Sequence, residues 1–453
     1  MERERFFIHD RGFYRTLFPL LLTVALQNLV AYSVNMADNL MLGNYSQNAL
    51  SGAAIVNQVF FLVQSIAGGI GEGLVVLSSQ YWGQRRPGPI RTLTGIALKL
   101  GALFGAAVFA VCALLPAGLL RLFSADGAIV AEGMAYMDIL KWSFPLFIFT
   151  TVLMSVLRSV ETVRISFYVS VLSLAVNVGV NFTLIYGRLG FPELGVRGAA
   201  VGTLLARALE LAAVLVYLLR HDKKLLLFSE NFLKPDAELR RDYAKVELPV
   251  MLSHFLWAVS VPMQTAILGH LSSDAIAANS VATTFYQYLK VIVQADSAAC
   301  AVMIGAAVGR GDLREVRQAG RTLSVLSVSI GAVLGLALLL LRIPLLRLYR
   351  LTPEALALAD SLLAVMSAVM VGMSYQMPVS MGVIRGAGDA RFTMYMNIIS
   401  TWAIVMPLSF LSAFVWRWSV VAVVAVIQSD QLFKGIPVFL HFCRYNWIKK
   451  LTR

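Results

Sequence analysis

Charged residues are scarce in this sequence: Asp, Glu, Lys and Arg together make up 14% of its 453 residues. Soluble globular domains contain about a quarter charged residues and about half apolar ones. Here 58% of the residues are hydrophobic, and the mean hydropathy is +0.74. So little charge cannot cover a surface that faces water, and so many apolar side chains exclude a disordered chain. The composition therefore predicts an integral membrane protein.

The sequence also lacks the motifs of an enzyme. Its three cysteines lie in apolar stretches without metal-binding or redox spacing. We find no glycine-rich nucleotide loop, no cluster of metal ligands and no motif that pairs a nucleophile with a base. These absences exclude an ATP-driven pump and argue against a membrane enzyme, so no cofactor is expected. The lack of a repeated pore-loop filter disfavours a channel.

Acidic residues are outnumbered by basic ones, 25 to 38, which gives a net charge of +13. In a soluble protein such a surplus would suggest a nucleic-acid partner. Membrane proteins, however, collect Lys and Arg in their cytoplasmic loops. We therefore expect this chain to be surrounded by membrane lipid and to bind no nucleic acid.

Long apolar runs are what the sequence has in abundance. A helix needs about 20 mostly apolar residues to cross the hydrocarbon core of a bilayer. Twelve such runs occur, six on each side of a polar stretch at 220–245. They lie at about 16–41, 50–81, 92–116, 133–157, 165–187, 197–219, 247–270, 278–308, 320–344, 359–384, 393–415 and 418–442. The sequence therefore predicts an all-α membrane protein with twelve transmembrane helices.

With twelve spans both termini lie on one side of the membrane, and the basic residues indicate which side. Loops on the side of the termini carry 26 Lys and Arg, whereas loops on the opposite side carry 7. Because the basic loops are the cytoplasmic ones, both termini are predicted to be cytoplasmic, in a protein of the cell (inner) membrane. The five remaining basic residues lie within the runs: Lys99, Lys141, Arg207, Lys290 and Lys434.

The two sets of six helices resemble each other. A shift of 226 residues aligns LMLGNYSQNAL (40–50) with AILGHLSSDAI (266–276), and a shift of 227 aligns VLRSVETVRISFY (156–168) with VIRGAGDARFTMY (383–395). A repeat of six helices is even, so both halves enter the membrane from the same side, related by a pseudo-two-fold axis along the membrane normal. We predict an N-lobe (1–219), a cytoplasmic linker (220–245) and a C-lobe (246–453), with the substrate route between the lobes.

Several strings in this order resemble the multidrug and toxic compound extrusion (MATE) transporters. The resemblance covers nearly the whole chain and implies a V-shaped fold of two six-helix lobes. It also implies export of drugs or metabolites, driven by the influx of protons or sodium. The strings are MADNLMLGNYSQNALSGAAIVNQ (36–58), SSQYWGQRR (78–86), NVGVNFTLIYG (177–187), GVRGAAVGTLLAR (195–207) and VIRGAGDARFTM (383–394).

Asp38 is the sharpest candidate for the chemistry of coupling. It lies near the outer end of the first helix, with Asn35 and Asn39 close by. Burial disfavours the charged form of a carboxyl group, so Asp38 could alternate between a protonated state and a carboxylate that binds a cation. The other interpretation is a carboxylate at the membrane boundary that merely caps a loop. The resemblance favours the first, because an acid at this motif position takes part in cation coupling in the family.

Asn177 and Asn181 lie four residues apart, so their amides face one side of the fifth helix. In the family an Asn-x-x-x-Asp pair at this place helps to bind the coupling cation. Here the second member is Asn181, which removes one negative charge and fits proton coupling, or weak sodium binding, better than a tight sodium site. Thr203 could add a hydroxyl ligand. Alternatively, these three residues only form hydrogen bonds between helices. No metal is expected other than a sodium ion at Asp38, if sodium is the coupling ion.

Glu72, Lys290 and Asp296 are further polar candidates within the runs. Glu72 stands among glycines of the second helix, as a second protonation site or as a structural hydrogen-bond partner. Lys290 and Asp296 are six residues apart on the eighth helix and do not share one face. They either replace a cation site of the second lobe or form a structural ion pair, which we favour. The acidic positions of the family's sodium-driven branch fall near Trp257 and Ser374, and neither residue carries a charge.

The leading hypothesis is a secondary active antiporter that exports lipophilic, cationic drugs or metabolites in exchange for protons or sodium by alternating access. Its substrate is a small organic molecule, and the chain is expected to function as a monomer. The alternative is a flippase for lipid-linked oligosaccharides from the related superfamily. A flippase should line its cavity with several Lys or Arg for the pyrophosphate. The chain offers few of them within its spans, which favours the antiporter.

Overall fold

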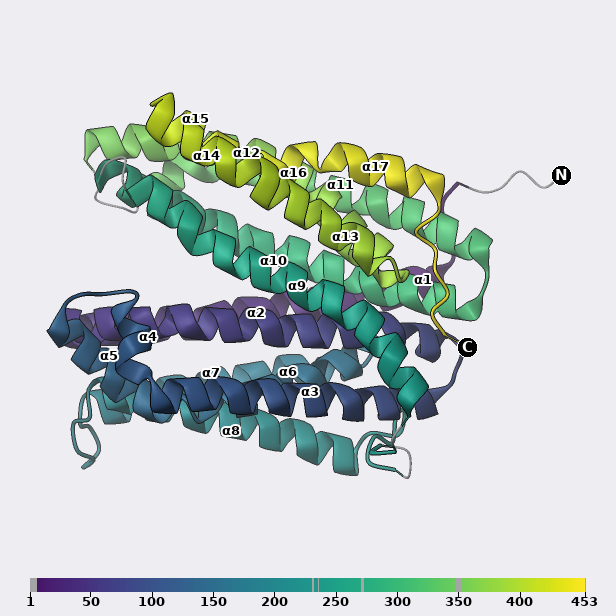
Figure 1. Cartoon of the computed structure of the whole chain (residues 1–453), viewed down its shortest axis with the longest axis horizontal. Helices are drawn as coiled ribbons and strands as arrows, with labels where there is room; N and C mark the ends of the chain where they lie inside the picture. The colour runs from purple at the N-terminus through teal and green to yellow at the C-terminus, as the bar shows by residue number, and fades with distance from the viewer. Residues whose placement is uncertain (1–5, 230–231, 235, 270–272, 348–351, 453) are drawn as a thin grey trace. The chain divides into compact units, whose positions relative to one another are not determined.

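The structure is a computed structural model that describes residues 6–229, 232–234, 236–269, 273–347 and 352–452. These residues form helices joined by loops, and no strand occurs among them (Figure 1). The first eight helices are α1 (Arg11–Tyr45), α2 (Gln47–Gly83), α3 (Pro87–Leu114), α4 (Pro116–Arg121), α5 (Gly127–Leu140), α6 (Ser143–Ser159), α7 (Arg164–Ile185) and α8 (Val196–Arg220). The others are α9 (Ala237–Gly269), α10 (Ser273–Arg310), α11 (Leu313–Leu346), α12 (Pro353–Met377), η1 (Pro378–Ile384), α13 (Ala390–Asn397), η2 (Ile398–Val405), α14 (Met406–Phe410), η3 (Leu411–Val415), α15 (Val420–Gln428), α16 (Asp430–Phe433) and α17 (Gly435–Arg444), where η marks a π-helical segment.

The number of membrane spans agrees with the prediction. Eleven helices among the described residues are long and apolar enough to cross a membrane, and the bent pair α5–α6 makes a twelfth. The predicted fourth run, 133–157, is therefore two helices that meet at 53°. Pro145 lies in the first turn of α6, where its missing N–H cannot reach the carbonyl group of Lys141, so the α5 ladder is not continued. The prediction of an all-α membrane protein is confirmed.

The chain divides into two compact units. The N-unit comprises Leu26–Ser78 and Arg86–Glu247, and the C-unit comprises Met1–Ala25, Ser79–Arg85 and Leu248–Arg453. Helices α1, α2 and α9 each continue from one unit into the other. The predicted boundaries of the lobes and of the cytoplasmic linker stay predictions.

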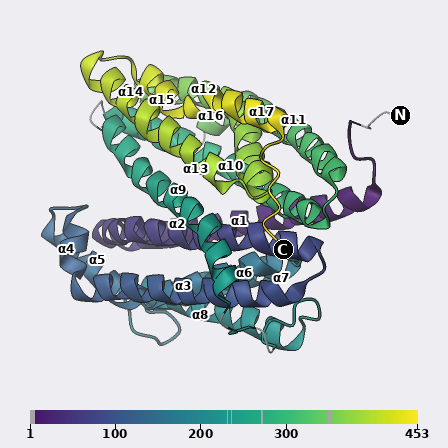
Figure 2. The same cartoon turned by 45° about the vertical axis from the view of Figure 1, so that its right-hand side comes forward.

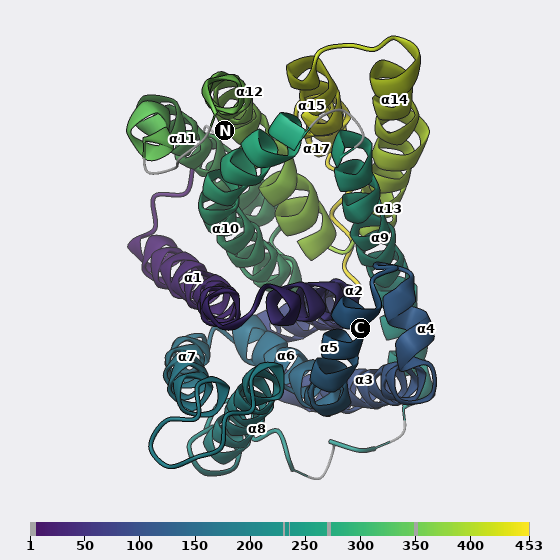
Figure 3. The ribbon, with the colours of Figure 1, turned by 90° about the vertical axis from the view of Figure 1, so that its left-hand side faces the viewer.

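Small residues bring the helices of the N-unit close together. Helices α7 and α8 lie side by side, and α8 also packs on α5 and α6 (Figure 3). A Cβ atom on Gly198 of α8 would lie 2.7 Å from the carbonyl carbon of Leu184 in α7, so only glycine permits this approach. Such close contacts between backbones are the usual way in which membrane helices associate. They hold the side chains of α7 against those of α8.

Helix α10 forms the centre of the C-unit. In its apolar window 83% of the residues are buried, and the helix packs against α11, α12 and η1. A Cβ atom on Gly382 of η1 would lie 2.6 Å from the Cβ atom of Cys300, so glycine again permits the close packing. This position places Lys290 and Asp296 of α10 inside the unit.

The last span of the C-unit is broken near its middle. It extends over Val420–Arg444 as α15, α16 and α17, beside α13 and α14 (Figure 2). Gly435 follows the break, and Pro437 lacks the N–H that would bond to the carbonyl group of Phe433. The break leaves Asp430 and Lys434 halfway along a membrane span.

Candidate functional site

The N-unit contains a buried polar cluster that we call the Asp38 centre; it consists of Asp38, Tyr136, Asn177, Asn181 and Thr203. The Nδ2 atom of Asn181 donates a hydrogen bond to Oδ1 of Asp38 at 2.5 Å and another to Oδ1 of Asn177 at 3.3 Å. The Nδ2 atom of Asn177 donates to Oγ1 of Thr203 at 3.4 Å. Asp38 is 7% exposed, and both asparagines are 0% exposed. The structure thus brings together the four residues that the sequence predicted as one site.

The packing of α7 on α8 orients Asn181. A Cβ atom on Gly202 would overlap the Oδ1 atom of Asn181, so Gly202 leaves the space that this amide occupies. The Oδ1 atom itself is buried and accepts no hydrogen bond from the described residues. Asn181 therefore directs its donor to Asp38 and retains a free acceptor.

Tyr136 of α5 belongs to the same centre, although the sequence analysis did not single it out. It is 2% exposed, and its hydroxyl group forms a hydrogen bond with Thr203. A tyrosine in an apolar helix gives no sign of what its hydroxyl group contacts, so only the packing of α5 on α8 shows the contact.

The charge closest to Asp38 in sequence-distant helices is already neutralised. Arg207 of α8 acts on Asp38 electrostatically, but its Nη1 atom lies 2.8 Å from Oε2 of Glu210. The guanidinium group also lies 4.9 Å from the ring centroid of Phe147. The Asp38 carboxyl group is thus solvated by neutral amide and hydroxyl groups, with a cation nearby that has its own partner.

Glu72 lies in a different part of the N-unit. It is half-buried on α2 and interacts electrostatically with Arg158 of α6, and it is not among the groups that act on Asp38. Next to it, a Cβ atom on Gly73 would overlap the carboxylate of Glu247, which is 1% exposed. The sequence analysis missed Glu247, because it stands among the charged residues that precede the apolar run of α9.

The structure does not bring Lys290 and Asp296 together. Asp296 is 1% exposed and accepts a hydrogen bond from Oγ of Ser327 at 2.5 Å, with the thiol of Cys300 at 3.8 Å. The amino group of Lys290 lies 5.4 Å from the ring centroid of Trp257 and interacts electrostatically with Asp430. The two residues of α10 thus have separate partners within the C-unit.

Lys290, Asp430 and Lys434 form a second charged centre, which we call the C-unit cluster. The Nζ atom of Lys434 lies 2.8 Å from Oδ2 of Asp430. The sequence analysis counted Lys434 among the basic residues within spans but did not notice Asp430 four residues before it. That spacing on a helix was the available signal.

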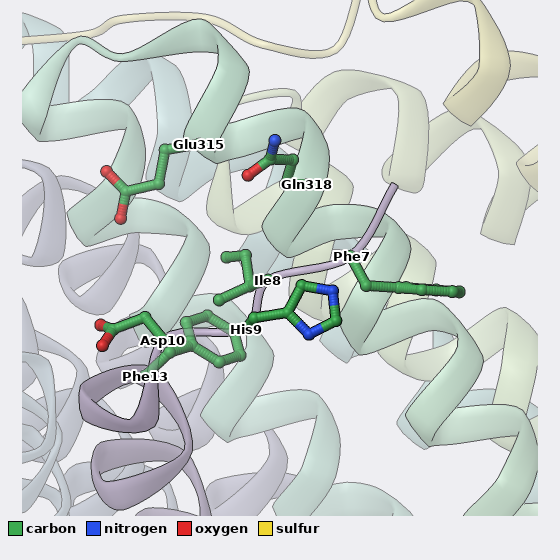
Figure 4. A pocket seen from close by; sticks show the side chains of 7 residues that line it. All are labelled: Phe7, Ile8, His9, Asp10, Phe13, Glu315 and Gln318. Carbon is green, nitrogen blue, oxygen red and sulfur yellow. The ribbon is translucent and has the colours of Figure 1, made fainter. Parts of the chain in front are cut away.

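A pocket of about 520 Å³ lies elsewhere in the C-unit, where the start of the chain meets α11. It contains none of the predicted site residues. Its lining is Phe7, Ile8, His9, Asp10, Phe13, Glu315 and Gln318 (Figure 4).

Comparison with known proteins gives consistent matches over nearly the whole chain. The family model MatE matches residues 23–183 and 249–411, more than half of the chain. The probable multidrug resistance protein NorM of Thermotoga maritima is 24% identical over 444 residues, which cover 97% of this chain and 94% of the relative. The uncharacterized transporter YisQ of Bacillus subtilis is 22% identical over 435 residues, or 96% and 95% of the two chains.

Solved structures share the fold. A MOP superfamily transporter from Pyrococcus furiosus, described as having a binding pocket of reverse polarity, gives a TM-score of 0.87 at 19% identity and covers 96% of both chains. An outward-facing multidrug resistance MATE family transporter gives a TM-score of 0.85 at 18% identity and covers 95% of both chains.

Proposed function

Because the chain belongs to the MatE family of multidrug efflux transporters, we propose that it is a secondary antiporter that exports lipophilic organic cations in exchange for protons. Asp38 is the group that binds the proton. The chain works as a monomer by alternating access in the cell (inner) membrane, with both termini in the cytoplasm. It needs no cofactor.

One observation carries this proposal: Asp38 is a buried carboxyl group that neutral donors surround. An ionisable side chain inside a membrane is expensive and is by default a functional candidate. Asn181 donates to the carboxylate form of Asp38. When Asp38 is protonated it becomes a donor itself, and the unpaired Oδ1 atom of Asn181 is an acceptor on the same side chain. The centre can therefore satisfy both protonation states with small rotations.

The ligand set supports a proton over sodium. A hard cation such as sodium is held by several oxygen atoms. At the Asp38 centre the nearest neighbour of the carboxylate is the amide nitrogen of Asn181, which repels a metal ion. Turning that amide would offer an oxygen atom but would lose the hydrogen bond to Asp38. A sodium site would thus have to break the contact that organises the centre.

Coupling requires that the proton and the substrate affect each other's binding. If protonation of Asp38 weakens substrate binding, then bound substrate must weaken proton binding by the same factor. Export follows when substrate is taken up with Asp38 deprotonated and is released after Asp38 takes up a proton from outside. Return of the protonated carrier then delivers the proton to the cytoplasm.

Ethidium efflux from vesicles tests this function. A proton gradient, a sodium gradient or no gradient is imposed on vesicles that contain the wild type, Asp38→Asn or Asp360→Asn. Asp360 is a matched carboxylate on α12, partly exposed and paired with Arg342 at 2.8 Å. We expect the proton gradient alone to drive efflux in the wild type and in Asp360→Asn, and no gradient to drive it in Asp38→Asn.

Three results would contradict the proposal. Efflux that ignores both gradients excludes antiport, and efflux that sodium alone drives excludes proton coupling. Normal proton-driven efflux in Asp38→Asn excludes Asp38 as the coupling group.

A further inference from the structure

The C-unit cluster of Lys290, Asp430 and Lys434 is not used by the proton chemistry proposed above. Asp430 and Lys434 occupy the middle of the span Val420–Arg444, and Lys290 lies well inside the span Ala278–Arg310. Charged side chains at such depth are rare, face the interior of the protein or a water-filled cavity, and mark substrate or ion pathways. The cluster therefore needs an explanation of its own.

Within the cluster every printed acceptor is already occupied. The Oδ2 atom of Asp430 accepts from Nζ of Lys434 at 2.8 Å, and its Oδ1 atom accepts from the amide of Gln431 at 2.8 Å. The amide oxygen of Gln431 in turn accepts from Gln376 at 2.6 Å. These bonds hold Asp430 in place on the broken helix.

Donors, in contrast, are left over. Lys434 donates to Asp430 and, at 3.2 Å, to Oδ1 of Asn397, which uses two of the three donors of an ammonium group. Lys290 makes no hydrogen bond to any of the residues that the structure describes. The cluster thus has unused ammonium donors and no unused carboxylate oxygen.

The charges point the same way. Two ammonium groups share the single carboxylate of Asp430, so one positive charge is not neutralised within the cluster. Lys434 is 6% exposed and Asp430 is 8% exposed. A buried surplus of charge is unfavourable unless a counter-charge is supplied. Excess donors and an excess positive charge together fit an anionic oxygen ligand.

An aromatic ring lies beside the surplus charge. The amino group of Lys290 stands over the ring of Trp257, 5.4 Å from its centroid. The Trp257 side chain is 41% exposed, so part of its surface is available to a ligand. A ligand that binds Lys290 through an anionic group could place an aromatic or apolar part against this indole.

We propose that the C-unit cluster is a substrate subsite for a carboxylate, so that the transporter takes amphiphilic compounds that carry a carboxylate next to their cationic group. This inference rests on the proposed transport of lipophilic organic cations and narrows their chemistry to zwitterions. Lys290 and the free donor of Lys434 bind the carboxylate, and Asp430 fixes Lys434 in position.

Rhodamine B and its ethyl ester are suitable probes. They share one cationic ring system, and only rhodamine B has a free carboxylate. Their dissociation constants are measured by fluorescence anisotropy with the purified full chain in phosphatidylcholine nanodiscs. The readout is the preference for the free acid, that is, the dissociation constant of the ester divided by that of rhodamine B.

Three variants set the charge of the cluster. Lys290→Gln removes the surplus charge without breaking the Asp430–Lys434 pair, and Asp430→Asn adds one more positive charge. Lys99→Gln removes a lysine from an exposed position of α3 in the N-unit. A charge-assisted hydrogen bond corresponds to about tenfold in affinity. We therefore expect the preference for the free acid to fall about tenfold in Lys290→Gln, to rise in Asp430→Asn and to stay at the wild-type value in Lys99→Gln.

The opposite signs make the test decisive even if one variant folds poorly. A preference that does not change in Lys290→Gln, or that falls as much in Lys99→Gln, overturns the proposal. A second set of nanodiscs contains phosphatidylglycerol. If this lipid weakens rhodamine B binding in the wild type but not in Lys290→Gln, while the variant keeps the wild-type preference in pure phosphatidylcholine, the ligand is a lipid headgroup and the subsite is not one for substrate.

Binding in nanodiscs needs no gradient, so this experiment is independent of the Asp38 test. Failure here leaves proton-driven efflux of cations intact. Failure of the Asp38 test leaves the measured preference for the free acid intact.

Discussion

The two units carry opposite net charges within their spans. In the N-unit, the Asp38 carboxyl group stands beside an Arg207–Glu210 pair that is neutral as a whole. In the C-unit, two lysines share Asp430. The surplus is thus one acid in the N-unit and one base in the C-unit. Two halves that repeat their helices have been given different polar chemistry.

The matching positions show how the difference arose. With the shift of 227, Arg207 aligns with Lys434 and Thr203 aligns with Asp430. Both halves thus keep a cation at the same place in their sixth helix. Its carboxylate partner follows it by three residues in the N-unit, as Glu210, and precedes it by four in the C-unit. The repeat preserves the cation, whereas its partner has moved along the helix.

The largest expected effect is at Asp38, where the comparison can be broken most directly. With the shift of 226 its counterpart is Gln264, and the counterparts of the two asparagines are Ile404 and Leu408. We expect proton-driven ethidium efflux to fall to background in Asp38→Asn and to stay there in Asp38→Asn/Gln264→Asp, because no amide in the C-unit can solvate the new carboxylate. Recovery of efflux in the double variant would show that the two halves are interchangeable.

The next largest effect is on stability and concerns Lys434. Lys434→Met leaves the carboxylate of Asp430 buried without its ion-pair partner, which costs about 3–5 kcal/mol. We expect a clearly lower midpoint of thermal unfolding in detergent and recovery of most of the loss in Asp430→Asn/Lys434→Met. An unchanged midpoint in Lys434→Met would mean that the ion pair contributes little and that the C-unit cluster is not the counterpart of the N-unit pair.

A smaller effect is expected at Gly202, which supports the geometry of the Asp38 centre. In Gly202→Ala the new methyl group would overlap the amide of Asn181, and such overpacking costs about 1–3 kcal/mol. Proton-driven efflux should weaken because Asn181 is displaced from Asp38. Gly179→Ala on α7 is the control, since nothing lies within 4 Å of the added atom. Equal loss of efflux in both variants would contradict the role of Gly202.

The smallest effect is expected at Asp296, the buried acid of the C-unit. Ser327→Ala removes the hydroxyl group that donates to it and should cost about 1 kcal/mol of stability. Proton-driven efflux should stay normal, because we assign no coupling to Asp296. Weaker efflux in a variant of unchanged thermal stability would make Asp296 a second coupling group and would reduce the contrast between the units.

Much of the Asp38 centre could be predicted from the sequence. The spacing of Asn177 and Asn181 places both amides on one face of a helix, and an acid within an apolar run is conspicuous. Tyr136 could not be predicted, because its hydroxyl group gains a partner only when α5 packs on α8. Asp430 was overlooked for another reason: a charge four residues from an opposite charge is easily taken for a self-contained pair.

The sequence by itself determined the environment, the number of spans and the family. These follow from composition, from runs of apolar residues and from ordered motifs, all of which are local along the chain. Even the bend between α5 and α6 was marked by Pro145, although the pattern of apolar residues continued across it.

Only the tertiary structure decided which charges meet. Lys290 and Asp296 lie on one helix, yet α12 to α16 supply different partners to each. Electrostatic and hydrogen-bond energies depend on distances of a few ångströms between side chains that are far apart in sequence. The surplus acid of the N-unit and the surplus base of the C-unit are therefore properties of the fold, which sequence patterns alone could not locate.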